Sequence, residues 1–323
     1  MKVKTLFFGT AEFAVSILKA LIASDEVEVV GVVTQPDKAA GRDHDLMIVP
    51  VKQLVNSIDI NLARSNIRMF QPDKLREDAA RILEETAPEI IIVAAYGQMI
   101  PDEIINYPKY GIYNLHGSLL PDLRGAVPVQ MSILLGRPQA GITMQKLVKA
   151  LDEGDIAVSE PINLNGSETT ESLMTTLADV AADLTIGTIP KIVSGDIEFV
   201  PQDHSQATYC YQSDIAKDKA EIKIDTDVEL AERMIRAFYP WPVAWCLVKM
   251  PNGEPKRLKI FAANIIDPEN GAEMPVNAAE GLQLSKHGKT LLLPLKNGIL
   301  ELKEVQLEGK QRRSAKDYLF LAT

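Results

Sequence analysis

The side chains best suited to chemistry lie at the ends of two predicted strands. Asn114 and His116 follow a short apolar run and precede a segment rich in turn residues, so they mark the point where a strand opens into a loop. Because they are two residues apart, their side chains project from the same face of the strand. Asp152 lies just before a Glu-Gly-Asp turn and the next predicted strand, residues 156–162.

These three residue types together fit a site for acyl transfer. The Asn114 amide can donate a hydrogen bond to a carbonyl oxygen that becomes negatively charged in the transition state. The His116 imidazole can give or take a proton, and the Asp152 carboxylate can fix its tautomer and stabilise its charged form. The hypothesis requires the imidazole and the carboxylate to face each other.

The surrounding pattern predicts an α/β fold with a Rossmann-like, open and mostly parallel sheet. Residues 3–8 and 27–34 are predicted strands, and residues 11–23 between them have apolar side chains at helical spacing. This alternation indicates parallel strands joined by right-handed crossovers. The apolar run 89–97 is typical of a central strand. Ligands bind outside the carboxyl ends of such strands. Further helices are predicted at 51–57, 73–86, 127–135 and 166–195, and strands at 67–70 and 141–148.

The pattern changes in the last third of the chain. A helix predicted at 228–237 precedes strand-like runs separated by turns, at 246–250, 257–266, 281–285, 290–295 and 299–307. Short strands of this kind predict a small β-barrel. The 323 residues exceed what one core usually supports. We therefore expect a first domain at 1–196, a linker at 197–210 and a second domain at 211–323.

Composition excludes several classes of protein. Hydrophobic residues make up 46% and charged residues 24%, as in soluble globular proteins. No run of about 18 apolar residues predicts a membrane span, and the N-terminus lacks a signal peptide, so a cytoplasmic location is expected. Cys210 and Cys246 lie far apart, which predicts no structural metal site. The first strand-helix turn, residues 9–14, has a single glycine and predicts no nicotinamide cofactor.

The charge distribution limits how a nucleic acid could bind. The net charge of −10 argues against sequence-independent binding over the whole surface. Residues 211–323 hold 17 Lys and Arg against 16 Asp and Glu, which leaves −11 for residues 1–210. A nucleic acid would therefore contact the second domain and one loop. Residues 34–52 form a long polar segment that is predicted to be such a loop, without secondary structure of its own.

The segment NLHGSLLPDLRGAVP, residues 114–128, followed by LDEGD with its first aspartate at position 152, resembles the folate-dependent formyltransferases. The resemblance covers nearly the whole chain. It implies transfer of the formyl group of 10-formyltetrahydrofolate to methionine carried by initiator tRNA, with no metal. It assigns catalysis to Asn114, His116 and Asp152. Asp155 is the rival carboxylate, but the family's catalytic aspartate directly follows a leucine.

The same resemblance implies the binding residues. Contacts with the folate cosubstrate are implied for Ser118, Leu119, Leu120, Pro121, Tyr96, Gly97 and Ile100. The loop 34–52 is similar to one that inserts beside the tRNA acceptor end, with Arg42 and Lys38 as the expected cations. Relatives tend to be basic where this chain has Asp43, His44 and Asp45. The second domain resembles an open OB-type barrel that contacts tRNA, and a monomer is expected.

The implied mechanism gives each site residue a role. The free amine attacks the formyl carbon, Asn114 and His116 hold the oxygen, and Asp152 helps take the amine's proton, directly or through water. His116 is expected to act protonated, because a nearby carboxylate favours the charged imidazole.

Three alternatives stay open. They are the same reaction on a sugar-nucleotide amine, an RNA-binding protein without activity, and hydrolysis of the formyl donor. The loop 34–52 and the barrel favour tRNA, because the reaction itself requires neither.

Overall fold

The structure, a computed structural model, describes residues 2–40, 45–58, 67–250, 252–266, 285–287 and 289–321. The chain divides into two compact units, which are described separately here. Unit 1 comprises Met1–Gly125, Ala140–Ile162 and Met174–Tyr209, and unit 2 comprises Ala126–Gln139, Asn163–Leu173 and Cys210–Thr323. Two segments that precede the predicted linker therefore group with the C-terminal strands. Among the described residues, no helix is both long and apolar enough to cross a membrane.

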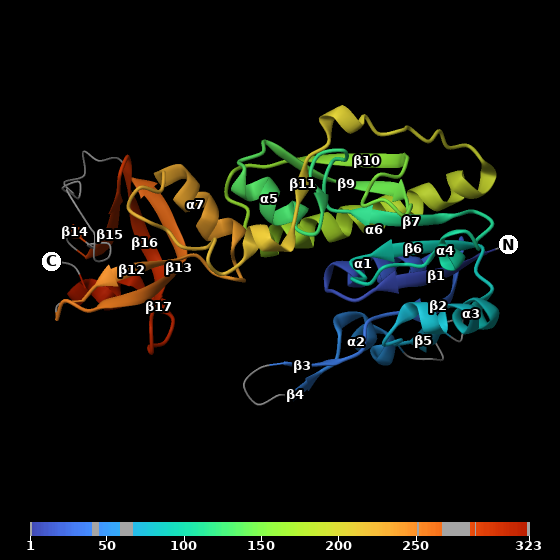
Figure 1. Ribbon diagram of the computed structural model, residues 1–323, viewed down its shortest axis with the longest axis horizontal. Coiled ribbons are helices and arrows are strands. Elements are labelled where there is room, and N and C mark those ends of the chain that lie inside the picture. Colours follow the sequence, from blue (N-terminus) through green and yellow to red (C-terminus); the bar gives the residue numbers. More distant parts are fainter. Residues whose placement is uncertain are drawn as a thin grey trace. The chain divides into compact units, whose positions relative to one another are not determined.

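Unit 1 is organised around a seven-stranded sheet with the order β10-β9-β7-β6-β1-β2-β5 (Figure 1). The paired neighbours from β7 through β6, β1 and β2 to β5 are parallel, whereas β7 and β9 are antiparallel. The predicted Rossmann-like, mostly parallel sheet is confirmed. The strands are β1 (Val3–Gly9), β2 (Val27–Val33), β5 (Arg68–Phe70), β6 (Ile90–Ala94), β7 (Ile112–His116), β9 (Gln139–Lys146) and β10 (Ile156–Asn163).

Apolar helix faces build the core around this sheet. Leu75, Ala79 and Ile82, at helical spacing, pack in one cluster with Leu6 and Phe8 of β1. The central strands are consequently buried on both faces, as expected for parallel strands. The helices of unit 1 are α1 (Phe13–Ala23), α2 (Pro50–Ser57), α3 (Leu75–Thr86), α4 (Asp102–Ile105) and most of α6 (Thr170–Ser194). Helices α5 (Pro128–Leu134) and α7 (Val228–Ala237) belong to unit 2.

The segment 34–52 contains structure that the sequence did not suggest. β3 (Lys38–Ala40) and β4 (Asp45–Met47) pair as a short antiparallel ribbon, and α2 begins at Pro50. The expectation of a segment without secondary structure is therefore wrong. Antiparallel pairing satisfies backbone N–H and C=O groups locally, so strands of only three residues can form, although they are too short to show a hydrophobic period in the sequence.

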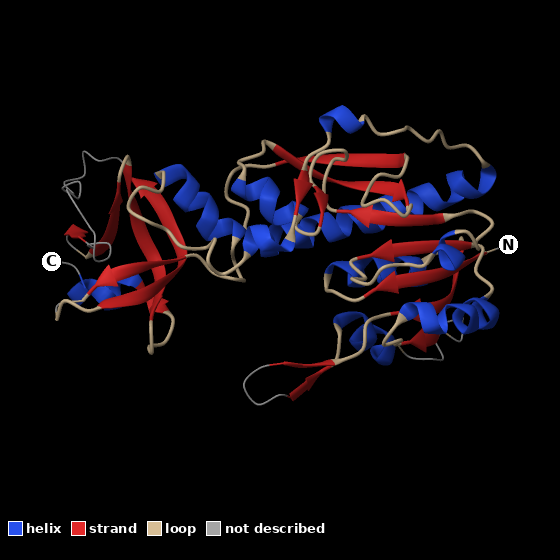
Figure 2. Cartoon of the chain, in the orientation of Figure 1, coloured by secondary structure: helices blue, strands red, loops and turns tan. Residues whose placement is uncertain are grey.

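Unit 2 carries an antiparallel sheet of short strands, seen in red in Figure 2. Its order is β12-β13-β16-β15-β14, and β17 pairs with β16. The register of β13 shifts on either side of Ala262, and such bulges bend a strand and help a sheet to curl. The predicted OB-like half-barrel is confirmed. The strands are β12 (Trp245–Lys249), β13 (Pro255–Ile266), β14 (Ser285–His287), β15 (Thr290–Leu295), β16 (Gly298–Leu307) and β17 (Arg313–Ser314).

Helix α7 begins where the sequence predicts. The Asp227 carboxylate accepts hydrogen bonds from the backbone N–H groups of Glu229 and Leu230, which caps the helix. Its buried residues include Ala231, Met234 and Ile235.

Of the strand predicted at 281–285, only Ser285 lies within the described residues, where β14 begins.

Candidate active site

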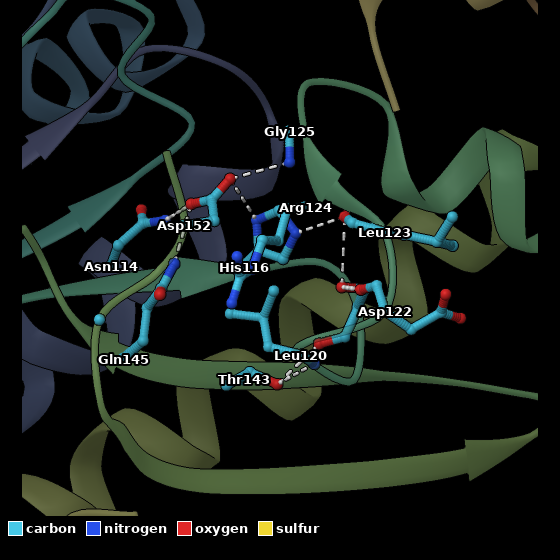
Figure 3. Close-up of polar contacts among 12 residues, drawn as sticks. Asn114, His116, Leu120, Asp122, Leu123, Arg124, Gly125, Thr143, Gln145 and Asp152 are labelled. Atoms are coloured by element: carbon cyan, nitrogen blue, oxygen red, sulfur yellow. Dashed lines mark hydrogen bonds and ion pairs between the residues drawn. The ribbon is translucent and has the colours of Figure 1, made fainter. Parts of the chain in front are cut away.

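The ends of β7 and β9 bring together the three residues that the sequence singled out. Asn114 and His116 lie on β7, and Asp152 lies in the turn between β9 and β10. The Asp152 side chain points toward both of them (Figure 3). His116 is 5% exposed, and the Asp152 side chain is 12% exposed, so the cluster is shielded from solvent yet not sealed.

Nitrogen atoms surround the Asp152 carboxylate on both sides. Oδ1 accepts a hydrogen bond from Gln145 Nε2 at 2.8 Å and a longer one from Asn114 Nδ2 at 3.4 Å. Oδ2 accepts a hydrogen bond from the Gly125 backbone N–H at 2.9 Å and lies 3.7 Å from His116 Nδ1. An ionised carboxylate is an acceptor only, and this arrangement offers it donors on each oxygen.

The imidazole of His116 is held by groups at both nitrogens. Nε2 lies 2.9 Å from the Leu123 carbonyl oxygen, and because a carbonyl can only accept, Nε2 carries a proton. Nδ1 faces Asp152 at an ion-pair distance that is too long for a direct hydrogen bond. The ring orientation is therefore set, while Nδ1 keeps room for another partner.

Backbone geometry at the site is unusual at two non-glycine residues. Asp152 has a φ of 52° and Leu123 a φ of 58°, in the left-handed region that side chains disfavour. Next to Asp152, a Cβ at Gly154 would lie 1.7 Å from the Lys146 carbonyl oxygen, so only glycine fits there. Such backbone strain persists only where the surroundings enforce it, and it often marks a functional site.

The loop predicted to contact folate is fixed by hydrogen bonds. The Ser118 hydroxyl donates to the Asp122 carbonyl at 2.5 Å, and the Thr143 hydroxyl donates to the Ser118 carbonyl at 2.7 Å. Thr143 also accepts the Leu120 backbone N–H at 3.1 Å, and the peptide bond between Leu120 and Pro121 is cis. The loop shape is thereby tied to β9.

The other residues predicted to contact folate differ in how far their side chains or backbone are exposed. Leu119 is half-buried, and the side chains of Tyr96 and Ile100 are buried, so these two serve the core and could meet a ligand only through their backbone. Burial raises the pKa of the Tyr96 phenol, with a smaller contribution from the Asp78 carboxylate. Gly97 is exposed and has a φ of 84°, and a Cβ there would lie 2.3 Å from Gln35 Nε2.

Of the two predicted tRNA contacts, only Lys38 falls within the described residues. Arg42, together with Asp43 and His44, lies outside the described residues, and Lys38 is the first residue of β3. Met47, which ends β4, is 59% exposed.

The base of the ribbon is anchored by Asp37. Its carboxylate accepts hydrogen bonds from Lys52 Nζ at 2.5 Å, Gln71 Nε2 at 3.2 Å and the Val49 backbone N–H at 3.3 Å. The bond from Lys52, helped by the other two donors, lowers the pKa of Asp37 although partial burial opposes the shift. The Lys52 partner is therefore the main cause of the lowered value.

Sequence reasoning missed the polar partners of Asp152. Gln145 and the Gly125 N–H both contact its carboxylate, and neither was singled out. A signal for Gln145 was present, because it is a polar residue inside the apolar run that forms β9.

The rival carboxylate, Asp155, lies 3.9 Å from Lys146 Nζ with a side chain that is 44% exposed. Among the described residues, no group of three His, Cys, Asp or Glu side chains could hold a metal ion.

Family models match most of this chain. A model described as formyl transferase matches residues 1–189, and a model described as formyl transferase, C-terminal domain, matches residues 214–320.

Related sequences and solved structures extend this likeness. A methionyl-tRNA formyltransferase of Lachnospira eligens is 36% identical over 318 residues, covering 98% of this chain and 96% of that protein. One of Sulfurihydrogenibium sp. is 34% identical over 317 residues, covering 97% and 95%. HypX from Aquifex aeolicus in complex with tetrahydrofolic acid has a TM-score of 0.62 at 14% identity, covering 99% of this chain and 47% of that one. The sugar 3N-formyltransferase WlaRD, solved with dTDP and 5-N-formyl-THF, has a TM-score of 0.63 at 16% identity, covering 96% and 100%. At such identities the solved structures show a shared fold, whereas the sequence relatives extend over the whole chain. The chain therefore belongs to the methionyl-tRNA formyltransferase family.

Proposed function

We propose that this protein transfers the formyl group of 10-formyltetrahydrofolate to the amino group of methionine attached to initiator tRNA. The observation that carries the proposal is the cluster of Asn114, His116 and Asp152 at the strand ends of unit 1. Relatives that match along the whole chain are named methionyl-tRNA formyltransferases, which supports the acceptor. Two solved structures of the same fold contain folates, which supports the donor class.

Among the described residues, an exposed backbone position and a fixed loop are suited to binding a folate. Gly97 keeps its backbone exposed at a position where any side chain would collide with Gln35. The Ser118–Pro121 loop is held in one shape by Thr143. We expect the backbone at 96–97 and this loop to hold the pterin, with the half-buried Leu119 as an apolar contact, whereas the side chain of Leu120 is buried and only its backbone could meet the pterin. A bound formyl donor supplies the electrophilic formyl carbon.

Each polar group of the cluster has a chemical task in this proposal. One Asn114 N–H bonds Asp152 weakly, which leaves the other free to hold the formyl oxygen as negative charge develops. His116 acts as the protonated ring, with Nδ1 rather than Nε2 toward that oxygen, because Nε2 is committed to Leu123. The Asp152 carboxylate takes the proton that the acceptor amine loses as the new C–N bond forms, directly or through water. The bond between the formyl carbon and N10 of the donor then breaks, and tetrahydrofolate leaves as N10 takes up a proton.

The two predicted domains have different tasks in this proposal. We assign catalysis to residues 1–196 and tRNA contacts to residues 211–323 together with Arg42 and Lys38. Basic side chains in unit 2 lie against aromatic rings, with Arg257 4.0 Å from the Trp245 ring centre and Arg312 4.1 Å from that of Phe261. A tRNA substrate also implies a cytoplasmic location, and we expect a monomer.

The test is a formyl-transfer assay with the purified protein and a radiolabelled formyl donor. We expect label on methionyl-initiator tRNA and far less on methionyl-elongator tRNA. Transfer only to a sugar-nucleotide amine, release of formate without an acceptor, or no reaction with any amine would each overturn the proposal.

A further inference from the structure

We propose that Gln145 and Gln202 are positioning residues that fix the Asp152 carboxylate, and that Arg124 in turn fixes Gln202. The inference rests on the proposed function, because it assumes that Asp152 takes part in the reaction. It concerns side chains that lie one step away from the reacting groups.

Gln145 is the strongest partner of the carboxylate. It is 2% exposed and lies opposite Asn114 in the pairing of β7 with β9. Its Nε2 donates to Asp152 Oδ1 at 2.8 Å, against 3.4 Å for Asn114 Nδ2. The shorter bond from Gln145 holds the carboxylate, so Asn114 is left largely free for a substrate oxygen.

Gln202 holds the backbone of the same turn. It is 6% exposed, and its Nε2 donates to the carbonyl oxygens of Asp152 at 2.8 Å and Gly154 at 2.7 Å. The same nitrogen lies 3.3 Å from Gln145 Oε1, so the two amides form one network. One glutamine thereby ties down two carbonyl groups of the turn that carries the carboxylate, one of them on Asp152 itself.

Arg124 determines which way the Gln202 amide points. The guanidinium is fully buried, and its Nε and Nη2 donate to Gln202 Oε1 at 3.1 and 2.8 Å. A flipped amide would place its NH₂ group against the guanidinium and its oxygen against two carbonyls, which is unfavourable on every side. At the other end of the guanidinium, Nη1 lies 3.3 Å from Glu153 Oε1, which compensates the buried cation.

The turn needs such a clamp because Asp152 has the left-handed φ of 52°. That conformation is strained for a non-glycine residue, and it persists only when surrounding contacts enforce it. Without the clamp the turn would relax and carry the carboxylate away from His116 and the amine. A misplacement of about 1 Å can lower a rate by about 10²-fold.

The test replaces each glutamine by the similarly shaped methionine. We expect Gln145→Met and Gln202→Met to lower kcat by about 10- to 100-fold, with KM for both substrates changed less than about threefold. Gln139→Met is the matched control, because Gln139 is an exposed glutamine at the far end of the same strand β9. It should leave kcat within about twofold of wild type, and the melting temperature is recorded for every variant.

A double-mutant cycle separates positioning from a general structural role. If Gln145 acts through Asp152, adding Gln145→Met to Asp152→Asn lowers the single-turnover rate no further. Should Gln202→Met fail to fold, Gln202→Glu keeps an acceptor for Arg124 and replaces both hydrogen bonds to the turn by repulsion between its carboxylate and the carbonyl oxygens of Asp152 and Gly154. The same loss of kcat is expected for that variant.

The outcomes distinguish this inference from the proposed function. The variants are compared with whichever amine acceptor the wild-type enzyme formylates. Folded glutamine variants with kcat within about threefold of wild type, or effects that add fully to Asp152→Asn, would overturn the positioning role while the function stands. A wild-type protein that formylates no acceptor would refute the function regardless of the variants.

Discussion

At the scale of single residues, one carboxylate draws donors from widely separated parts of the sequence. Asp152 is contacted by two side chains and one backbone N–H, and it faces the imidazole of His116. The imidazole is itself tethered to the carbonyl of Leu123. A centre held in this way can stabilise charge without reorganising during the reaction.

The first prediction concerns the three proposed catalytic residues. Asn114→Ala, His116→Ala and Asp152→Ala should each lower kcat by about 10²–10³-fold, because each removes a group that acts in the transition state. Circular dichroism should show that the variants remain folded.

Asp155→Asn is the matched control for Asp152. Its carboxylate is 44% exposed and faces Lys146 Nζ at 3.9 Å, so activity should stay within about threefold of wild type. Near-normal rates in all three alanine variants, or a large loss in Asp155→Asn, would contradict the assignment.

At the scale of elements, the turn between β9 and β10 carries the proposed catalytic Asp152, and the ribbon of β3 and β4 carries Lys38, a proposed tRNA contact. The turn depends on close backbone approach at Gly154, whereas the ribbon depends on the polar anchor at Asp37. Substitutions at these two positions therefore test different physical causes.

The second prediction compares two glycines. Gly154→Ala should destabilise the protein by about 1–3 kcal/mol and reduce kcat, because the new methyl group would overlap the Lys146 carbonyl and move the turn. Gly187→Ala, at an exposed position in α6 with no atom within 4 Å of the added Cβ, should instead stabilise by about 0.5–1 kcal/mol. Urea denaturation measures both, and equal effects would refute the steric argument.

The third prediction concerns acid stability at the ribbon. The pKa of Asp37 is lowered in the folded protein, chiefly by the hydrogen bond from Lys52, so its stabilising contribution is present above the unfolded pKa. That contribution is lost as the pH falls through the lower, folded value. Asp37→Asn should therefore lose stability at pH 7 but little at pH 2, as judged from denaturation curves.

Asp25→Asn, at a side chain that is 87% exposed, is the control for the ribbon experiment and should match wild type at both pH values. An Asp37→Asn effect that is as large at pH 2 as at pH 7 would show that the carboxylate charge is not the cause.

At the scale of the whole molecule, an acidic protein is proposed to bind a polyanion. The net charge is −10, and residues 211–323 are nearly neutral. Binding must therefore depend on local cations, and the proposed ones lie in the 34–52 segment and in unit 2. Such contacts release counterions, so the affinity for tRNA should fall with salt.

The fourth prediction uses that dependence. Arg42→Ala should raise KM for the tRNA by about 10-fold and reduce the salt slope by about one unit, with KM for the folate unchanged. Arg76→Ala, an exposed arginine on α3, is the control. The double variant Asp43→Lys and Asp45→Lys should lower KM for the tRNA. An unchanged tRNA KM in Arg42→Ala would exclude the proposed contact.

Most helices and strands of this protein could be predicted from local patterns in the sequence. Hydrophobic periodicity located most helices and strands, because burial of one face depends on neighbours three, four or two positions away. The spacing of Asn114 and His116 placed both on one strand face for the same reason. The 34–52 segment was misjudged, because strands of three residues are too short to show a hydrophobic period.

Only the tertiary structure decided how the site is supported. Gln145, Gln202 and Arg124 meet around Asp152 although up to 78 positions separate them, and no local spacing encodes that meeting. The tertiary structure also determined the orientation of the His116 ring. Its Nε2 binds the Leu123 carbonyl oxygen, and its Nδ1 faces the Asp152 carboxylate. Local propensity acts over a few residues, whereas hydrogen-bond partners across a fold are chosen by how its strands and loops pack.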